Sequence, residues 1–357
     1  MSKVFILKTN PRSILKDYLN LLTKLEGIKT LKNQPIVLKL NLSWTKFYPA
    51  CSTPPWQLEG VIKSLLDLGF SPKKIIPVEN KTVVTDVYQG TRNHAWDKIL
   101  KKYKIEMHYL TEESYVRYQP KAKMMVLEKI FPNGIFLPKI IFEKPLISPC
   151  TMKTHVFTVT TGAIKNYFGM LREIRHYAHR YIHEAITDLL AIQKEIHPQI
   201  IGVMDGTVVG SGPGPRAMKW QIENYLLGST DLVSLDAIAA KMMGFDPLRI
   251  NYLKLAQKKG LGIADPKKIK IVGESIEKVN LGFKPANTLA SRGQKLIYHH
   301  TPLFLEKMLL QSRISPWSYL ASFLYHDVFW YNLIGRPRLA KFKKTSWGKL
   351  FQKYLSG

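Results

Sequence analysis

The fold is decided by residues 35–80, PIVLKLNLSWTKFYPACSTPPWQLEGVIKSLLDLGFSPKKIIPVEN. Short apolar runs lie at residues 35–41 and 74–80, and between them residues 54–69 carry apolar side chains at helical spacing. Gly69 suits the end of that helix, because glycine readily adopts the left-handed conformation of a helix C-cap. The pattern predicts a strand, a helix and a second strand, the unit from which parallel sheets are built.

The same alternation of strands and helices extends through about the first 280 residues. Strand-like runs and helical patterns alternate at residues 4–8, 104–110, 181–195, 199–206 and 231–244. A hairpin is predicted at residues 124–141, where Pro-Asn-Gly at 132–134 supplies a turn between two β-rich runs. We therefore expect an α/β fold, in one or two lobes, with a mainly parallel sheet sandwiched by helices.

The composition changes at about residue 284. Residues 284–357 contain twelve Lys and Arg against two acidic residues, and they are rich in aromatic side chains. The sequence therefore predicts an α/β domain at residues 1–283 and an added basic, aromatic-rich helical extension at residues 284–357.

Charge and cysteine content narrow the classes of protein. The 357 residues include 53 Lys and Arg against 26 Asp and Glu, a formal net charge of +27, which predicts a polyanionic partner. Cys51 and Cys150 are too few for an iron–sulfur cluster, so none is expected. The apolar run in MSKVFILKTNPRS is too short for a signal peptide, and we expect a cytoplasmic protein.

Polar pairs follow two of the apolar segments. Lys39 and Asn41 end the strand at 35–41, and Lys153 and His155 follow the segment KIIFEKPLISPCTM. Residues two apart project from the same face of a strand, and ligands of open parallel sheets bind beyond the carboxyl ends of the strands. The two pairs are therefore predicted to line one cleft. The alternative is that each lysine extends into solvent at a sheet edge.

A second cationic candidate lies in GAIKNYFG, residues 162–169. Lys165 and Asn166 follow a threonine-rich stretch, and threonine hydroxyls with free amides at a helix start can bind an anion. An ordinary capped helix with Lys165 in solvent fits the same residues.

The segment MDGTVVGSGPGPR, residues 204–216, combines an acidic residue with a glycine-rich loop. Asp205 follows an apolar strand and is a candidate for proton transfer or metal binding. Gly210, Gly212 and Gly214 permit close approach to a ligand, and backbone amides there can bind a carboxylate or phosphate. The loop matches neither the Walker nor the dinucleotide-binding pattern, and a simple turn is the alternative.

Histidines supply weak metal candidates. His176, His179 and His183 share one face if their segment is helical, and His155, His176 and His179 are the candidate ligands. A basic solvated face, with arginine neighbours, is the other interpretation. Asp236 lies in an apolar helical pattern, where an unpaired carboxylate is costly, so we expect it to have a partner such as a lysine.

Six motifs occur in order between residues 35 and 275: IVLKLNL, STPPWQLEGVIKSLLDLG, KTHVFTVTTGAIKNYFG, VMDGTVVGSGPGPR, STDLVSLDAIAAKMMGFDP and LAQKKGLGIADPKKIKIVGE. Together they resemble the domain-of-unknown-function family 362. This family is similar at superfamily level to the nickel-dependent lactate racemases, whose α/β lobes hold a nickel pincer bound by a lysine and histidines. The resemblance implies a cleft for a small carboxylate, or for a metal or organometallic cofactor. The positions that it implies are Lys39, Asn41, Lys153, His155, Lys165, Asn166, Asp205 and Asp236.

The end of the chain, RPRLAKFKKTSWGKLFQKYLSG, predicts an amphipathic helix from about Leu339 to Tyr354. Its aromatic side chains gather on one side and its basic residues on the other, which is typical of a helix on an anionic membrane. His326 and Asp327 argue against a bilayer-crossing segment just before it. Residues 315–357 are therefore predicted to attach the protein at the inner face of the membrane, and packing on the chain's own core is the alternative.

These observations favour a cytoplasmic enzyme whose cleft binds an anionic small molecule. The predicted reaction is isomerase- or racemase-type proton transfer next to a carboxylate, with His155, Asp205 and Lys153 as catalytic candidates. The alternative is a non-catalytic binding protein recruited to an anionic membrane surface or to nucleic acid. Nucleic acid is the less favoured partner because no reading motif accompanies the charge. Lysines converging in one cleft favour the enzyme, and a continuous exterior basic face favours the binding protein.

Overall fold

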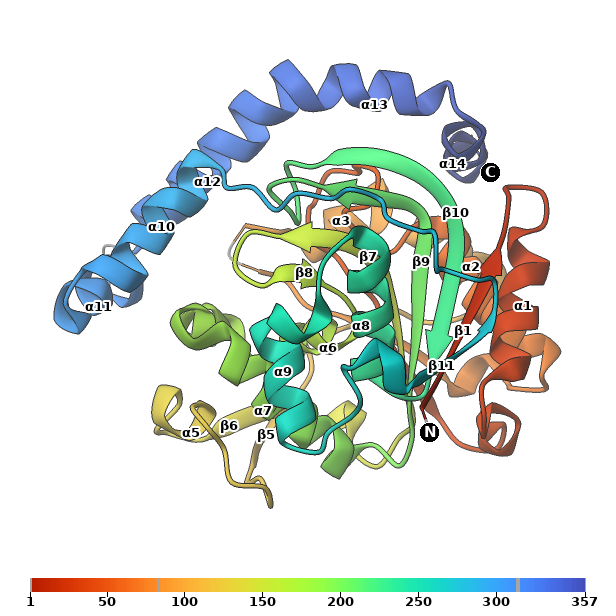
Figure 1. Ribbon diagram of the computed structural model, residues 1–357, viewed down its shortest axis with the longest axis horizontal. Helices are drawn as coiled ribbons and strands as arrows, with labels where there is room; N and C mark the ends of the chain where they lie inside the picture. Colours follow the sequence, from red (N-terminus) through yellow and green to blue (C-terminus); the bar gives the residue numbers. More distant parts are fainter. Residues whose placement is uncertain (1, 83, 313–314, 357) are drawn as a thin grey trace.

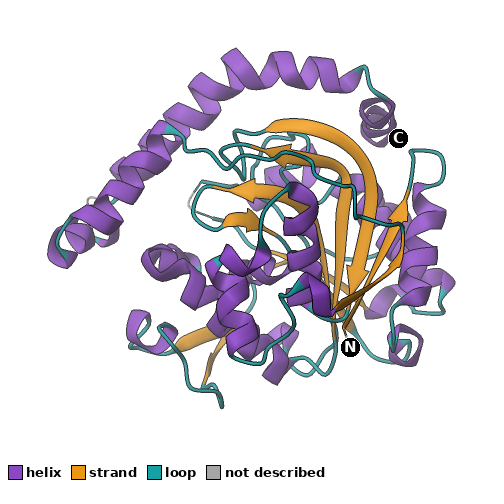
Figure 2. Ribbon diagram, viewed as in Figure 1, coloured by secondary structure: helices purple, strands orange, loops and turns teal. Residues whose placement is uncertain are grey.

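The computed structural model describes residues 2–82, 84–312 and 315–356. Within these residues, nine strands form one mixed sheet with helices on both faces (Figures 1 and 2). The order is β11-β1-β10-β9-β7-β2-β3-β4, with β8 paired to β7. Neighbouring strands are parallel except where β10 meets β1 and β9, and where β8 meets β7. The strands are β1 (Ser2–Lys8), β2 (Ile36–Lys39), β3 (Ile75–Glu79), β4 (His108–Tyr109), β7 (Leu146–His155), β8 (Val159–Thr161), β9 (Ile200–Ser211), β10 (Lys219–Ser229) and β11 (Ile269–Gly273).

The predicted α/β class and mainly parallel sheet are confirmed. Successive side chains of a strand point to opposite faces of the sheet, so the core has two parts. Ile36 and Leu38 pack on the side of α1 and α2, whereas Val37 packs on the side of α6 to α9. The helices on the two sides of the sheet are α1 (Ile14–Lys24) and α2 (Pro55–Asp67), and α6 (Ala163–Asn166), α7 (Ile182–Ile196), α8 (Leu232–Met243) and α9 (Asn251–Lys258). Further helices are α3 (Val87–Asn93), α4 (Trp96–Tyr103), α10 (Leu289–His300), α11 (Leu303–Gln311), α12 (Pro316–Phe323), the π-helix η8 (Leu324–Gly335), α13 (Arg336–Lys343) and α14 (Ser346–Ser356). Short 3-10 helices are η1 (Ile28–Leu31), η2 (Pro72–Lys74), η3 (Lys139–Ile141), η4 (Tyr167–Met170), η5 (Glu173–Tyr181), η6 (Pro247–Arg249) and η7 (Pro266–Lys268).

The hairpin predicted at residues 124–141 is only half correct. Its second arm is β6 (Ile135–Pro138), but β6 pairs with β5 (Tyr115–Tyr118). The first arm instead contains the short helix α5 (Leu127–Ile130). The Asp188 carboxylate explains the helix, because it accepts hydrogen bonds from the amides of residues 125, 126 and 127 and so caps the helix start.

The C-terminal extension is helical, as predicted, but its end packs on the protein itself. Phe342, Trp347 and Phe351 are at most 2% exposed. Phe351 stacks on Phe47 with 3.5 Å between ring centroids, and the Trp347 and Trp56 centroids are 5.0 Å apart. The aromatic face that was predicted to lie in a membrane interface between residues 339 and 354 is therefore buried in the core. No helix in the described part of the chain is long and apolar enough to cross a bilayer.

Replacing Trp347 with alanine tests this packing. Removal of a fully buried indole should lower the free energy of unfolding by about 3 kcal/mol. Leu355→Ala is the matched control, because Leu355 lies on the same helix and is 40% exposed. Urea unfolding of the full chain measures both variants, and equal small losses would contradict the packing.

Candidate functional site

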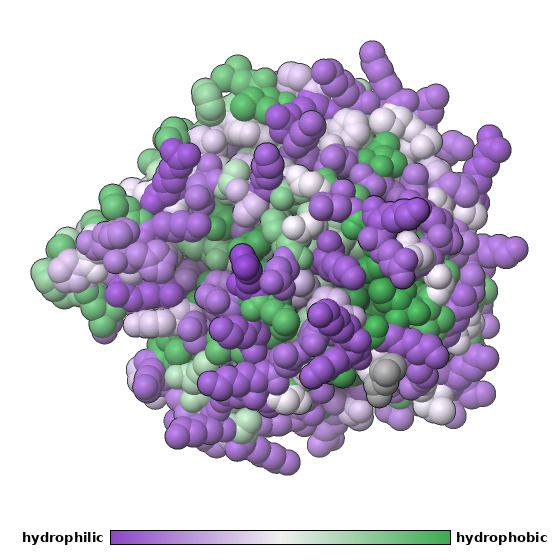
Figure 3. All heavy atoms as spheres, viewed as in Figure 1, coloured by the Kyte–Doolittle hydropathy of each residue, from purple (hydrophilic) through white to green (hydrophobic). Residues whose placement is uncertain are grey.

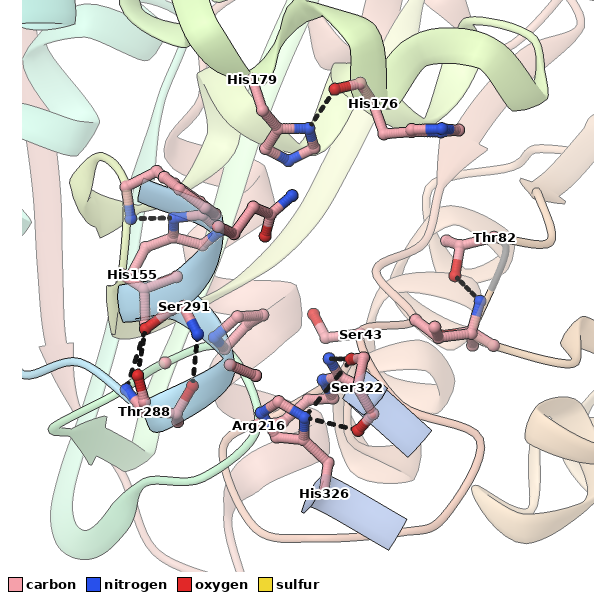
Figure 4. Close-up of a pocket in the computed structure, with 18 of the residues that line it drawn as sticks. Ser43, Thr82, His155, His176, His179, Arg216, Thr288, Ser291, Ser322 and His326 are labelled. Atoms are coloured by element: carbon pink, nitrogen blue, oxygen red, sulfur yellow. Dashed lines mark hydrogen bonds between the residues drawn. The ribbon is translucent and has the colours of Figure 1, made fainter. Parts of the chain in front are cut away.

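A cavity of about 610 Å³ lies beyond the carboxyl ends of β2, β3 and β7. This volume suits a small-molecule ligand. Strand ends and loops form one wall, and helices α10 and α12 with η8 form the other. Figure 4 shows His155 and His179 facing this space from one side and Arg216 from another. The cleft is therefore shared between the α/β domain and the C-terminal extension.

A buried ion pair joins two of the strand ends. Lys39 Nζ lies 2.7 Å from Glu79 Oε1, and both side chains are at most 4% exposed. Glu79 also accepts hydrogen bonds of 2.8 Å from the backbone amides of Leu42 and Asn80. Burial lowers the pKa of Lys39, and the Glu79 carboxylate opposes that shift. Among the described residues that line the cavity, Glu79 is the only carboxylate, and its partners are already in place.

Two asparagines connect β2, β7 and α6 beside this ion pair. Asn166 donates from Nδ2 to the Lys39 carbonyl at 2.7 Å and to Ser148 Oγ at 3.0 Å. Asn41 donates to Asn166 Oδ1 at 3.2 Å. Lys39, Asn41 and Asn166 all line the cavity, as the sequence predicted.

Lys153 lies beneath the cavity wall and not on it. It is 1% exposed, and its Nζ donates to Asn41 Oδ1 at 2.6 Å, to Thr151 Oγ1 at 2.8 Å and to the Cys51 carbonyl. Burial lowers its pKa to about 8. Because these acceptors surround the ammonium group, Lys153 positions Asn41, and the predicted catalytic role at the cleft is not supported.

Lys165, on α6, has no counter-ion in the described part of the chain. It lines the cavity, and within the described residues it makes no hydrogen bond or ion pair; its Nζ lies 5.5 Å from the Phe168 ring centroid. Burial, with a smaller effect of the Lys153 and Arg175 charges, lowers its pKa to about 7. A substantial fraction of Lys165 is therefore neutral near pH 7.

His155 and His179 line the same cavity as neutral imidazoles. The Phe157 amide donates to His155 Nδ1 at 3.1 Å, so the neutral ring carries its hydrogen on Nε2. His179 Nδ1 lies 2.8 Å from the His176 carbonyl and donates to it. Burial and then the charge of Lys165 hold the pKa of His155 well below its usual range, and the same two causes lower that of His179 to about 3.

These histidines do not assemble a metal site with three protein donors. Across residues 2–82, 84–312 and 315–356, no group of three or more His, Cys, Asp or Glu is arranged to hold a metal ion. His176 Nε2 pairs instead with Tyr319 Oη at 2.8 Å. Lys153, the lysine of the KTH motif, is also enclosed below the cavity. The donor set therefore does not fit a lysine- and histidine-bound nickel pincer, and no step of the chemistry below uses one.

Two arginines that the sequence reasoning missed complete the cationic wall. Arg216 donates from Nη2 to Ser322 Oγ at 2.9 Å, while its buried Nη1 has no hydrogen-bond partner within the described residues. Burial lowers the pKa of Arg216 to about 10, so it stays charged. Arg175 donates to the Leu171 carbonyl at 3.1 Å and also lines the cavity. The sequence feature that could have indicated Arg216 is its position at the end of the glycine-rich segment GPGPR, residues 212–216.

The glycine loop does not form the predicted anion cradle. Gly210 and Gly212 do not line the cavity, and their carbonyls accept from Thr154 Oγ1 at 3.3 and 2.8 Å. Gly214 does line it, but its amide donates to the Gly212 carbonyl at 2.8 Å, and the flanking prolines have no amide hydrogen. Glycine is required at 214 because a Cβ there would lie 1.9 Å from the Thr154 carbonyl oxygen.

Asp205 lies in the core, contrary to the prediction. It is 1% exposed and does not line the cavity, because β9 continues to Ser211 instead of ending near Gly206. Its carboxylate accepts from Tyr18 Oη at 2.7 Å and from Trp56 Nε1 at 2.9 Å. Burial raises its pKa. Asp205 therefore links β9 to α1 and α2 and has no access to a ligand.

Asp236 has a partner, but it is not a lysine. Its carboxylate accepts from the amides of Ala163 at 2.8 Å and Ile164 at 3.2 Å, the first residues of α6. Asp236 is 2% exposed and does not line the cavity. It therefore fixes the short helix that carries Lys165 and acts as a positioning residue.

The opposite wall comes from the C-terminal extension, which the sequence reasoning did not place at the site. Ile297 and Tyr298 of α10, Trp317 and Ala321 of α12 and Tyr325 of η8 line it. Thr288 starts α10 through a capping box with Ser291. The cleft therefore has a cationic half at the strand ends and, among the described residues, a half without lysine or arginine at the helices, where apolar and aromatic side chains alternate with polar ones such as Gln294 and Ser322.

The fold and site define an α/β protein with a cationic cleft at the carboxyl edge of a mainly parallel sheet. A family model described as "Domain of unknown function (DUF362)" matches residues 36–241, more than half of the chain. The chain belongs to this family. Searches of curated proteins and of solved structures gave no match. The resemblance found from the motifs is confirmed, whereas similarity to the nickel-dependent lactate racemases stays a prediction.

Asp236 should give stability a measurable pH dependence. Burial raises its pKa from 3.8 to about 7, so the folded protein retains a proton that the unfolded chain releases above about pH 4. This group therefore costs stability progressively as the pH rises from about 4 to 7. Relative to Asp236→Asn, which cannot titrate, the free energy of unfolding should fall by about 3 kcal/mol between about pH 5 and 8. Parallel pH profiles of the two proteins would contradict the assignment.

Proposed function

We propose that the cleft binds a small molecule carrying a carboxylate or a similar anionic group, and that Lys165 moves a proton next to that group. The charge balance of the wall carries this proposal. Within the described residues, four cations line the cavity, Lys39, Lys165, Arg175 and Arg216, against the single carboxylate of Glu79. Since Glu79 already neutralises Lys39, the positive charge of Lys165 and Arg216 favours an anionic ligand.

Arg216 is the candidate anchor for the anion. A buried nitrogen–hydrogen group without an acceptor is costly, and Nη1 of Arg216 is in this position. A carboxylate oxygen supplies a charge-assisted hydrogen bond of the kind that guanidinium groups make. Binding would therefore satisfy a group that the protein alone leaves unpaired.

Lys165 is the candidate proton acceptor. A general base works best when its pKa lies near the working pH, and a pKa of about 7 meets that condition. His155, which carries its hydrogen on Nε2, can donate a hydrogen bond to the oxygen where negative charge develops. The Lys165 amine and the His155 imidazole therefore support abstraction of a proton from the carbon next to a carboxylate, which is the reaction step that isomerases and racemases catalyse.

The shape of the cleft adds a constraint on the ligand. The anionic end of the ligand would face the strand ends, and the rest would face α10, α12 and η8, whose lining includes Ile297, Trp317 and Tyr325. An anionic molecule with an apolar portion fits both halves. The alternative is that the protein binds the same molecule without catalysis. Exchange of a ligand proton with solvent would distinguish catalysis from binding alone.

Solvent deuterium exchange tests the proposed reaction. The full chain should incorporate deuterium at C2 of at least one member of a panel of short 2-hydroxy and 2-amino carboxylates in D2O, measured by NMR. The rate should rise with pH through about 7, as free Lys165 loses its proton. Lys165→Met should lower the rate by at least about a hundredfold, because general-base catalysis contributes on the order of 10²–10⁴.

Arg216 variants separate binding from proton transfer. Arg216→Met should raise the half-saturating concentration of the active carboxylate by about tenfold or more, and Arg216→Lys should recover part of the loss. Thermal unfolding of each variant controls for folding. Absence of exchange with every carboxylate would refute the enzymatic proposal, whereas saturable binding without exchange would favour the binding protein.

A further inference from the structure

The outer surface of the C-terminal helices is unusually apolar. We define the helical arm as residues 289–312 and 315–335, which comprise α10, α11, α12 and η8. Of the sixteen exposed large hydrophobic side chains within the described residues, twelve lie in the arm. Leu289 and Trp317 line the cavity, but the other ten do not, and of these Phe304 and Leu333 are 68% and 63% exposed. Figure 3 shows apolar side chains at the projecting end of the arm. Monomeric proteins rarely expose contiguous apolar surface unless it serves an interaction.

Part of this surface follows one side of a continuous helix. Leu320, Leu324, Val328 and Leu333 succeed one another at intervals of four, four and five residues, and each is 47–63% exposed. Residues four apart share a face of an α-helix, and the i→i+5 hydrogen bonding of the π-helix η8 keeps residues four and five apart on one side. None of the four lines the cavity, so the ligand does not explain their apolar character.

The charges around this surface have one sign. The only two acidic residues after position 283 are buried: Glu306 pairs with Arg180, and Asp327 accepts from Trp44 Nε1 at 2.9 Å. The described residues from 284 onward therefore expose no carboxylate. Their exposed basic side chains include Arg292, Lys307, Arg336 and Lys341.

We propose that the outer face of the helical arm docks on an anionic lipid membrane. A lipid surface accepts both kinds of side chain, because its acyl boundary buries the apolar residues and its headgroups attract the basic ones. A second copy of the chain, at +27, would bring like charges together and is disfavoured. The docking face therefore lies on the helical arm and not on α14, because Trp347 and Phe351 of α14 are buried in the core.

This proposal is independent of the proton-transfer proposal. The inner face of the same helices lines the cleft, so docking would hold the cleft beside the membrane. The two proposals can fail separately, because vesicle binding needs no carboxylate ligand and deuterium exchange needs no vesicle.

Flotation of the full chain with vesicles tests the docking face. The protein should float with phosphatidylcholine–phosphatidylglycerol vesicles, much less with phosphatidylcholine alone, and less as salt rises. The triple variant Leu320→Gln, Leu324→Gln, Leu333→Gln should bind anionic vesicles at least about tenfold more weakly. Leu248→Gln with Leu355→Gln is the control, since both residues are exposed elsewhere on the protein.

Reversal of basic charges provides a second test. Lys307→Glu with Arg336→Glu should weaken binding to anionic vesicles by about tenfold or more. Lys267→Glu with Lys268→Glu makes the same change in charge on η7, away from the arm, and should have a much smaller effect. Urea unfolding checks that all variants fold.

Three results would overturn the proposal. The first is that the wild type fails to float with anionic vesicles, and the second is that the arm variants and the control variants float equally. The third is that the wild type is a dimer which the leucine variant converts to a monomer without loss of flotation. That result would assign the apolar face to contact with a second copy of the chain.

Discussion

The ion pair between Lys39 and Glu79 is the constraint on which the cleft depends. Both groups are buried at the carboxyl ends of neighbouring strands, and their 2.7 Å contact offsets part of the cost of removing them from water. Glu79 also receives two backbone amides, so it fixes the chain where it leaves β2 and β3. Glu79 is also the only carboxylate on the described cavity wall, and it is already paired with Lys39.

Because no second carboxylate lines the described cavity wall, Lys165 is not neutralised there. Lys165 has no counter-ion in the described chain, and burial lowers its pKa to about 7. Asp236 holds the helix that carries it, and Asn41 and Asn166 join that helix to the strand ends. The C-terminal helices then form the opposite wall with side chains such as Ile297 and Trp317, which lowers the local polarity and strengthens electrostatic interactions with a bound anion.

Sequence patterns predicted the sheet, its main helices and the helical C-terminus, because strand and helix periodicities are local. They also brought Lys39, Asn41, His155, Lys165, Asn166 and Gly214 to one cleft, since the carboxyl ends of parallel strands share an edge. Asp205 was misplaced because the end of an apolar strand is not visible when the chain continues into further valines. Arg216 and the covering helices were missed because long-range packing decides which surface they face. The aromatic face of α14 was assigned to a membrane because periodicity shows that a helix face is buried but does not show against what.

Lys165, half-buried in the cleft wall and without a counter-ion in the described chain, is the group on which the proposed chemistry depends. Its titration can be measured directly by NMR of lysine labelled with carbon-13 at the ε position, with Lys165→Arg identifying the resonance. A midpoint near pH 7 in the free protein is the predicted result. A midpoint near the usual 10.5 would mean that the side chain is solvated or paired, and it would contradict the account.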